Sequence, residues 1–381
     1  MTIGLEAERA NLPNPTGVEV YAAQLIKHLA KLDQRNQYVL YFRTKPQDWF
    51  YKLPSNFRIK VMPFPKFWTQ LRLSWEMIWH PVDVLVILAS ALPFIHPKNS
   101  IFTAHDIAYE FFPEAFTPFM RNYLIWSTRF AARHAAKIIA VSDSTKHDLV
   151  KRYQVSPENV KTIHLAVDHS QLKPLAEGEV KAVLDKFGLE YKKYILFIGT
   201  LQPRKNIKRL VDAYIQLKKE KGIEEKLVIA GGKGWLFEPI LKKINQAGMQ
   251  EEIKFLGYIE EADKCALYNG AVALTLPALY EGFGLPPLEA MACGVSVVVS
   301  NVSSLPEVVG EAGVMVDPNS TDSIAQGLFK ILSDKNLQKE LGEKGIARAR
   351  QFTWAETARK TLALLESLNT PDHPRVEDLG K

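Results

Sequence analysis

The sequence predicts an α/β protein of two doubly wound, Rossmann-like domains that face each other across a cleft. Short β-rich apolar runs alternate with helical patterns along most of its 381 residues. Such alternation is typical of parallel sheets covered by helices on both faces. A chain of this length also exceeds what one ordinary core holds, which favours two domains. The 47% hydrophobic and 24% charged content is typical of a soluble globular protein.

The individual elements follow from this alternation. Strands are predicted at Ile3–Ala7, Tyr38–Arg43, Arg58–Met62, Asp83–Leu88, Ser100–Ala104, Lys137–Val141, Val160–His164, Tyr194–Gly199, Lys226–Ala230, Ile253–Leu256, Ala271–Leu276, Val295–Ser300 and Val314–Val316. Helices are predicted at Gly17–Leu32, Thr117–Ala136, Asn206–Lys221, Phe237–Ala247, Ala262–Asn269, Pro287–Ala292, Thr321–Leu332 and Trp354–Leu368.

The alternation pauses between Asp168 and Lys193, where a charged stretch holds one weak helix, and we place the domain linker there. The predicted organisation is an N-terminal domain (1–170), a linker (171–193), a C-terminal domain (194–353), a helix that crosses back to the first domain (354–368) and a polar tail (369–381). Ligand sites are expected at the carboxyl ends of the strands, facing the cleft.

Charge and cysteine content restrict the protein class. Residues 1–170 hold 20 Lys and Arg against 14 Asp and Glu, whereas the remainder holds 28 of each, so the net charge of +6 lies in the first half. This excess favours an anionic partner such as membrane lipid or a phosphorylated glycan, or else a merely basic surface. We find no nucleic-acid-binding motif and no leader or membrane-span pattern, and Cys265 and Cys293 lack metal-site spacing and read as core thiols. A cytoplasmic protein is expected, either free or peripheral at the membrane.

The segment 277–294 carries the chemistry. A buried strand leads to a Gly282–Gly284 loop, a Pro pair opens a short helix, and Gly294 ends it. The free N–H groups at the start of that helix can receive a phosphate. Glu281 and Glu289 are placed to accept hydrogen bonds from two hydroxyl-bearing parts of one ligand, although carboxylates at a helix start can also serve the helix dipole alone.

This segment, Glu-Gly-Phe-Gly-Leu-Pro-Pro-Leu-Glu-Ala-Met-Ala-Cys-Gly, resembles the donor signature of family 4 retaining glycosyltransferases, whose fold is GT-B. The resemblance implies that Glu281 lies against the donor sugar and that Glu289 binds the nucleotide ribose. It implies that the C-terminal domain (194–353) binds the nucleotide sugar and that the N-terminal domain (1–170) binds the acceptor. It also implies that the intervening residues contact the sugar and the diphosphate: Gly282, Phe283, Gly284 and Leu285.

Two further loops extend the resemblance in the second half. Phe197–Asn206 resembles the family's phosphate-contacting loop, which implies donor binding at Gly199 and stabilisation of the leaving group by Arg204 and Lys205. Some related enzymes carry Arg directly after the strand-ending Gly. That place is Thr200 here, so we assign the Arg role to Arg204. The glycine-rich turn that begins at Gly231 and Gly232 is expected to line the nucleotide site. Ser304 and Glu307 read as a helix capping box.

The first half carries the family's glycine loop and His-Asp segment. Gly17 is expected to bring a helix N-terminus to the donor diphosphate from the opposite domain. His105, at a strand end, is expected to face the transferred sugar, or else to be a structural histidine, and Asp106 either orients it or caps the turn.

Two aromatic and basic segments stand apart from these motifs, residues 63–79 and 116–133. Each can dock on an anionic bilayer or bury its aromatic side chains in the core.

The sequence therefore predicts a retaining, metal-independent glycosyltransferase that moves a hexose from a nucleotide sugar to the hydroxyl of a glycan or lipid-linked acceptor. No Asp-x-Asp motif is present, so Arg204, Lys205 and helix N-termini are expected to meet the charge on the leaving diphosphate. Similarity of the Pro-Arg-Lys-Asn loop to mannosyltransferases favours GDP-mannose, with a UDP-sugar as the next donor. The alternatives are a GT-B-type epimerase or phosphorylase and a non-enzymatic sugar-binding protein.

Overall fold

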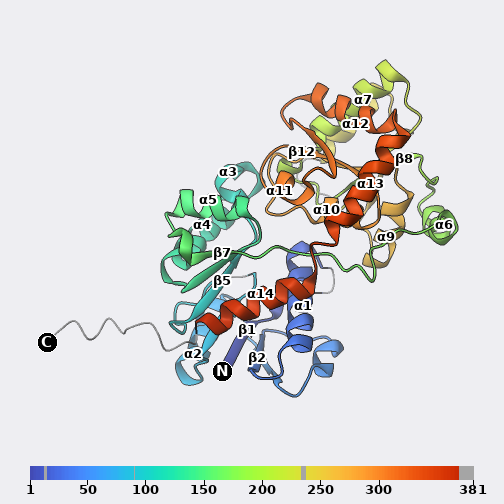
Figure 1. The fold of residues 1–381 in the computed structure, drawn as a ribbon. Coiled ribbons are helices and arrows are strands. Elements are labelled where there is room, and N and C mark those ends of the chain that lie inside the picture. Colours follow the sequence, from blue (N-terminus) through green and yellow to red (C-terminus); the bar gives the residue numbers. More distant parts are fainter. Residues whose placement is uncertain (13–14, 90, 233–236, 369–381) are drawn as a thin grey trace.

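The computed structural model describes residues 1–12, 15–89, 91–232 and 237–368. Two lobes are visible, each built on one parallel sheet with helices on both faces (Figure 1). The first sheet has the order β3-β2-β1-β4-β5-β6-β7 and the second has the order β10-β9-β8-β11-β12-β13. Both orders are those of a doubly wound sheet, so the predicted fold class is confirmed.

All thirteen predicted strands are present. Those of the first sheet are β1 (Thr2–Glu6), β2 (Gln37–Phe42), β3 (Phe57–Val61), β4 (Val84–Ile87), β5 (Ser100–Ala104), β6 (Lys137–Ala140) and β7 (Val160–Thr162). Those of the second are β8 (Tyr194–Ile198), β9 (Lys226–Ala230), β10 (Ile253–Gly257), β11 (Ala273–Leu276), β12 (Ser296–Ser300) and β13 (Gly313–Val316). The central strands β4, β8 and β12 are buried along their whole length, because helices cover both faces of each sheet.

The helices connect these strands. They are α1 (Gly17–Leu32), α2 (Ser74–Trp79), α3 (Ala108–Phe111), α4 (Pro118–His134), α5 (Asp143–Tyr153), α6 (Glu177–Lys186), α7 (Ile207–Lys221), α8 (Phe237–Ala247), α9 (Glu261–Gly270), α10 (Leu285–Ala292), α11 (Leu305–Val309), α12 (Thr321–Leu332), α13 (Lys335–Ala349) and α14 (Trp354–Ser367). No described helix is long and apolar enough to cross a bilayer.

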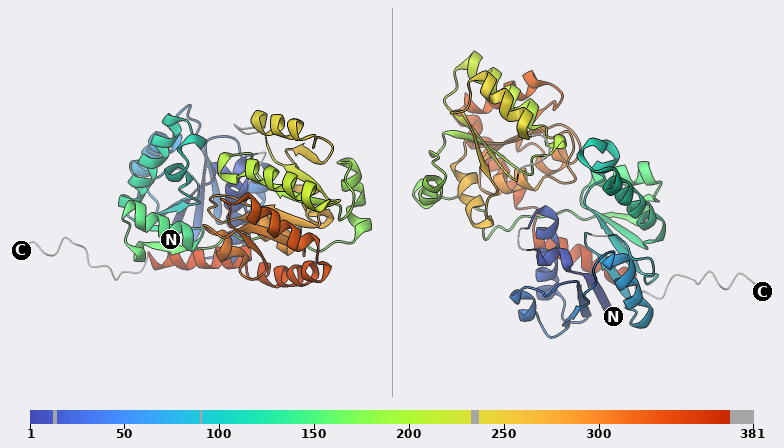
Figure 2. Two further views of the ribbon diagram at one scale, coloured as in Figure 1. Left: turned by 90° about the horizontal axis from the view of Figure 1, so that it is seen from above. Right: turned by 180° about the vertical axis from the view of Figure 1, so that it is seen from behind.

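The strand order reverses next to β1 in one sheet and next to β8 in the other. Loops leave the carboxyl ends of neighbouring strands in opposite directions at such a point, which opens a crevice for a ligand. The view from behind shows the two lobes as separate bodies, with the second lobe above the first (Figure 2). The loops after β1, β5, β8 and β11 supply the residues described below.

Helix α14 leaves the second lobe and packs along α1 of the first (Figure 1). The Trp354 ring lies 6.3 Å from the Tyr21 ring, and Thr357 Oγ1 donates to the His164 carbonyl at 2.9 Å. The predicted crossover helix is thereby confirmed. The weak helix expected in the linker is α6, which packs on α9, and the predicted tail lies outside the described residues.

Candidate active site

A cavity of about 440 Å³ lies between the two lobes. All thirteen residues that the sequence nominated line it, and both lobes contribute. They are Gly17, His105, Gly199, Arg204, Lys205, Gly231, Gly232, Glu281, Gly282, Phe283, Gly284, Leu285 and Glu289. The structure thus brings the nominated residues together around one space, and their individual roles remain predictions.

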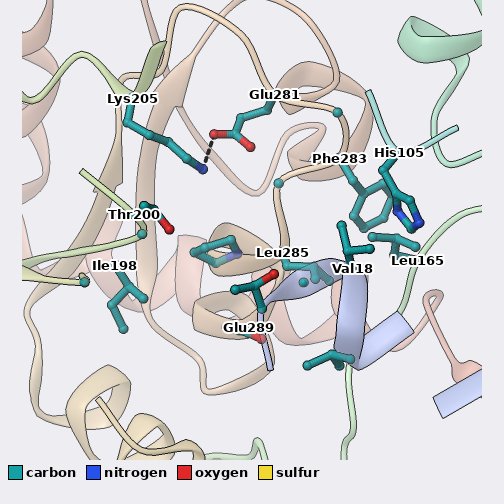
Figure 3. Close-up of a pocket in the computed structure, with 18 of the residues that line it drawn as sticks. Val18, His105, Leu165, Ile198, Thr200, Lys205, Glu281, Phe283, Leu285 and Glu289 are labelled. Carbon is teal, nitrogen blue, oxygen red and sulfur yellow. Dashed lines mark hydrogen bonds and ion pairs between the residues drawn. The ribbon is translucent and has the colours of Figure 1, made fainter. Parts of the chain in front are cut away.

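Two cationic side chains contact the Glu281 carboxylate in the wall of this cavity. Lys205 Nζ donates to Glu281 Oε1, and the two side chains point at each other (Figure 3). Arg204 Nη1 lies 3.5 Å from the other carboxylate oxygen and donates to the Tyr280 carbonyl at 3.1 Å. Lys205 is 7% exposed and Glu281 is 6% exposed. The cations that we expected at the diphosphate therefore also hold the carboxylate that we expected at the sugar.

Burial and charge act in opposite senses on this cluster. Burial raises the pKa of Glu281, but the charges of Lys205 and Arg204 outweigh burial and hold that pKa below its ordinary value. Burial opposes the charge of Arg204, and Glu281 with Asp106 more than offsets it, so the pKa of Arg204 is raised. Burial lowers the pKa of Lys205, although the charge of Glu281 opposes that effect. Glu281 is accordingly an anion at neutral pH.

Two serines hold the backbone of the 281–283 loop. Ser303, with φ of 57°, accepts from the Glu281 N–H at 3.2 Å and donates to the Glu281 carbonyl. Ser304 Oγ lies 2.9 Å from the Glu281 carbonyl oxygen and 2.8 Å from that of Phe283. The predicted capping box of Ser304 and Glu307 is wrong, because Ser304 serves this loop and Glu307 turns to the other lobe.

Helix α10 presents its first turn to the cavity, as predicted. Gly284 occupies the position before the helix with φ of 101°, and Gly294 ends it with φ of 73°. Glu289 Oε2 accepts from the Tyr268 hydroxyl at 2.6 Å, and both side chains are buried. A Cβ on Gly17 would lie 2.9 Å from Leu285 Cδ1, so the N-termini of α1 and α10 meet at the cavity. Both helix ends can act on an anion there.

The glycine-rich turn after β9 packs against the loop after β8. A Cβ on Gly231 would lie 1.9 Å from the Gly199 carbonyl oxygen, which only glycine permits. Gly232 continues the turn beside the cavity. Lys233 and Gly234, which belong to the same predicted motif, lie outside the described residues.

His105 faces the cavity from the first lobe, beside Phe283 (Figure 3). Its Nε2 lies 2.9 Å from the Leu88 carbonyl oxygen, so Nε2 carries the proton and Nδ1 is an acceptor. Burial lowers the pKa of His105 and keeps the ring neutral. Asp106 accepts from the Ala108 N–H at 2.9 Å, so of the two roles expected for Asp106 the structure favours capping the turn.

Hydrogen bonds across the cleft close the two lobes on each other. The Gly282 carbonyl accepts from the hydroxyls of Ser142 at 2.6 Å and Thr145 at 3.2 Å, both at the start of α5. Tyr280 donates to Asp148 Oδ2 at 2.8 Å. The same loop that holds Glu281 therefore forms the domain contact.

Glu307 completes this contact. It accepts from the N–H groups of Asp143 and Ser144 and lies 2.6 Å from His164 Nε2. Asp143, His164 and Glu307 are the one trio of possible metal ligands within 4.8 Å in the described part of the chain. Since both Glu307 oxygens already accept hydrogen bonds, we assign the trio to domain contact.

A second cavity of about 650 Å³ opens in the first lobe between β1, β5 and α4. Its walls carry acidic, basic and aromatic side chains, among them Glu8, Arg43 and Tyr123. The two cavities share Val18, His105, Asp106, Gln202 and Arg204. A donor in the first cavity and an acceptor in the second would meet at these residues.

The sequence did not single out Tyr268 or Ser303, or the domain contacts of Ser142, Thr145 and Asp148. A helical tyrosine or a serine cap carries no local signal of a partner that is 20 or more residues distant.

Comparison with known proteins agrees with this geometry. The model of "Glycosyl transferases group 1" matches residues 182–348, and that of "Glycosyltransferase Family 4" matches residues 15–171. The O-antigen chain mannosyltransferase B of Escherichia coli is 35% identical over 265 residues, 70% of this chain and 69% of that protein. The serotype-specific mannosyltransferase WbdA of E. coli is 31% identical over 252 residues, 64% of this chain, and the match spans only 31% of WbdA.

Solved structures share the fold. Sucrose-phosphate synthase from Thermosynechococcus elongatus superposes with a TM-score of 0.77 at 20% identity, over 97% of this chain and 99% of that one. Anabaena HepE in complex with UDP and glucose gives 0.74 at 18% identity, over 96% and 99%. With both halves matched by family models and a mannosyltransferase at 35% identity, this chain belongs to the group 1, family 4 glycosyltransferases, GT-B enzymes that transfer a sugar from a nucleotide sugar.

Proposed function

We propose that this enzyme is a retaining mannosyltransferase that uses GDP-mannose without a bound metal and glycosylates a hydroxyl of a glycan or lipid-linked acceptor. The observation that carries the proposal is the meeting of two cavities at Arg204 and His105, beside the Glu281–Lys205 pair. The two cavities, one for a donor and one for an acceptor, meet at a cationic side chain. This arrangement suits transfer of a sugar between two substrates. The relatives named above as mannosyltransferases favour mannose.

The residues divide the work by position. Glu289, fixed by Tyr268, would accept hydrogen bonds from the ribose, and the N-termini of α1 and α10 would face the diphosphate. Arg204 and Lys205 would share their charge between Glu281 and the leaving phosphate oxygens, so negative charge that develops there is met by groups already in place. No metal is needed to supply that charge.

Retention would follow from displacement on one face of the sugar. The C1–O bond to the diphosphate breaks while the acceptor oxygen bonds to C1 from the same side, and the acceptor proton passes to the departing phosphate oxygen. Glu281 is held by two cations and would be a poor nucleophile, so it would position the sugar instead. The Nδ1 atom of neutral His105 would accept a hydrogen bond from a sugar hydroxyl.

The test is product analysis with purified enzyme. GDP-mannose, UDP-glucose and other nucleotide sugars are each incubated with mannosyl acceptors in EDTA, and NMR identifies the product. We expect GDP and a new α-mannoside from GDP-mannose. A β-linked product would contradict retention, and activity that EDTA abolishes and Mg²⁺ restores would contradict metal independence. If the enzyme turned over only UDP-sugars, a UDP-sugar would replace GDP-mannose as the proposed donor. An altered free nucleotide sugar or a sugar phosphate would favour the epimerase or phosphorylase alternative.

A further inference from the structure

The helical segment over residues 68–79 exposes large apolar side chains, with Trp75 at 60% and Trp79 at 65% exposure. These exposed side chains recur at the spacing of one helix face: Leu71, Trp75, Ile78 and Trp79. The buried side holds apolar and polar side chains together: Trp68, Gln70, Leu73, Ser74, Glu76 and Met77. An apolar stripe that faces water indicates a contact surface.

The polar contacts fix this orientation. Glu76 is paired with Lys60, with Arg72 at 3.2 Å and with His80 at 3.1 Å. Turning the tryptophans inward would expose or break this buried charge network, which is costly. The segment therefore presents its tryptophans outward in the folded protein.

The apolar surface continues onto α4. Ile95 donates its N–H to Ser74 Oγ at 3.1 Å, and the exposed Phe94 ring lies 5.7 Å from that of Trp126. Phe119, at 73% exposure, lies further along α4. We call the apolar patch the set Leu71, Trp75, Ile78, Trp79, Phe94, Ile95, Phe119, Met120 and Trp126.

Positive charge borders the apolar patch. The segments 66–80, 94–99 and 118–134 hold six Lys or Arg residues and one acid, Glu76, which is buried. Arg129 and Arg133 are exposed on the same helical face as Trp126, three and seven residues after it. Two copies of the chain joined through this patch would bring these like charges together, whereas an anionic lipid surface complements them.

We propose that this face docks on a membrane containing anionic lipid, with Trp75, Trp79 and Phe119 in the headgroup region and Arg129 and Arg133 against lipid phosphates. Phe67, itself exposed, and Met120 of the patch also line the second cavity. The mouth of that cavity would then open beside the bilayer. If the proposed function holds, this placement favours a lipid-linked acceptor.

Vesicle flotation tests the docking without any donor or acceptor, so its outcome is independent of the proposed reaction. The full chain is mixed with vesicles of phosphatidylcholine alone or with 30% phosphatidylglycerol. We expect flotation with the anionic vesicles, at least tenfold less with phosphatidylcholine alone, and loss of flotation on Trp75→Glu/Trp79→Glu. Arg129→Ser/Arg133→Ser should weaken binding by about 25-fold, since each basic residue contributes about fivefold near an anionic surface.

Tyr51→Glu is the matched control, because Tyr51 is an exposed aromatic of the same lobe outside the patch. It should float like the wild type. Circular dichroism and the melting temperature confirm that each variant folds. Equal flotation of the tryptophan variant and the wild type would overturn the proposal. The proposal would also be overturned if the wild type did not bind vesicles and sedimented as a dimer that Trp75→Glu/Trp79→Glu converts to monomers.

Discussion

The two lobes differ in the large apolar side chains that they expose. Among the described residues, fifteen of the sixteen exposed large apolar side chains lie within the first 126 residues, and Tyr258 is the sixteenth. The second lobe exposes few such side chains and gathers buried charged groups around one cavity, as with Lys205, Glu281 and Glu289. One lobe is preorganised for a small, highly charged ligand, and the other offers a broad amphipathic surface. We call the second lobe, which is proposed to bind the donor, the donor half, and the first lobe the acceptor half. On that proposal, donor binding depends on exact contacts and acceptor binding on surface character.

Of the substitutions in the donor half, replacement of Lys205 should lower the activity most. We expect Lys205→Met to lower kcat by roughly 10²–10³-fold, because a preorganised cation beside the leaving group is lost. The measurement is steady-state transfer with the donor found active. Lys208→Met, at an exposed position three residues after Lys205, should stay within threefold of the wild type. If Lys205→Met folds and keeps full kcat, the leaving-group role of Lys205 is wrong.

Closure of the cleft should be the next most sensitive feature, because it joins the two lobes. A Cβ on Gly282 would lie 1.9 Å from the His105 carbonyl oxygen, so Gly282→Ala should force the lobes apart and lower kcat by roughly 10²-fold. Small-angle scattering should report a larger radius of gyration. Gly178→Ala, where an added Cβ meets nothing within 4 Å, is the control. An unchanged radius with unchanged kcat would mean that this contact is dispensable.

The sequence predicted the strands well and the contacts between distant parts of the chain poorly, for physical reasons. A strand buried on both faces is a continuous run of apolar residues, as in Tyr194–Ile198. Helix α13 was not among the predicted elements. Its Gly342 and Gly345 weaken the helical pattern, yet a Cβ on Gly342 would lie 2.5 Å from the Gly294 carbonyl oxygen. These glycines permit close packing against α10, which no local pattern reveals.

Candidate site residues were predictable where they sit in loops at strand ends, as Arg204 and Glu281 do. Partners from the other lobe were not, since Ser142 reaches Gly282 over 140 residues of sequence. The cysteines make the same point. Expected as two unrelated core thiols, they interact in space: Cys293 hydrogen-bonds Cys265 and lowers the pKa of the Cys265 thiol to about 6.

Tyr268→Phe should separate the effect of the donor half on substrate binding from its effect on the chemical step. The variant removes the hydrogen bond to Glu289, and we expect the donor KM to rise roughly tenfold with kcat unchanged. Tyr214→Phe is a matched control, because that buried hydroxyl bonds to the Glu225 carbonyl, away from the cavity. A fall in kcat with unchanged KM would move Glu289 from ribose binding to the reacting centre.

The smallest expected effect is a pH dependence of stability. The pKa of Glu281 is lower in the folded protein than its ordinary value of 4.5, because Lys205 and Arg204 favour the anion over the opposing effect of burial. The anion therefore stabilises the fold fully above about pH 4.5, and this contribution is lost as the pH falls through the lowered folded-state value. Glu281→Gln should melt below the wild type at pH 7, and the gap should narrow below pH 4.5. Glu343→Gln, exposed on α13, should show no such gap. A gap that stays constant down to pH 3 would mean that Glu281 is not held as an anion by its two cations, and the preorganised donor half would lose its central charge.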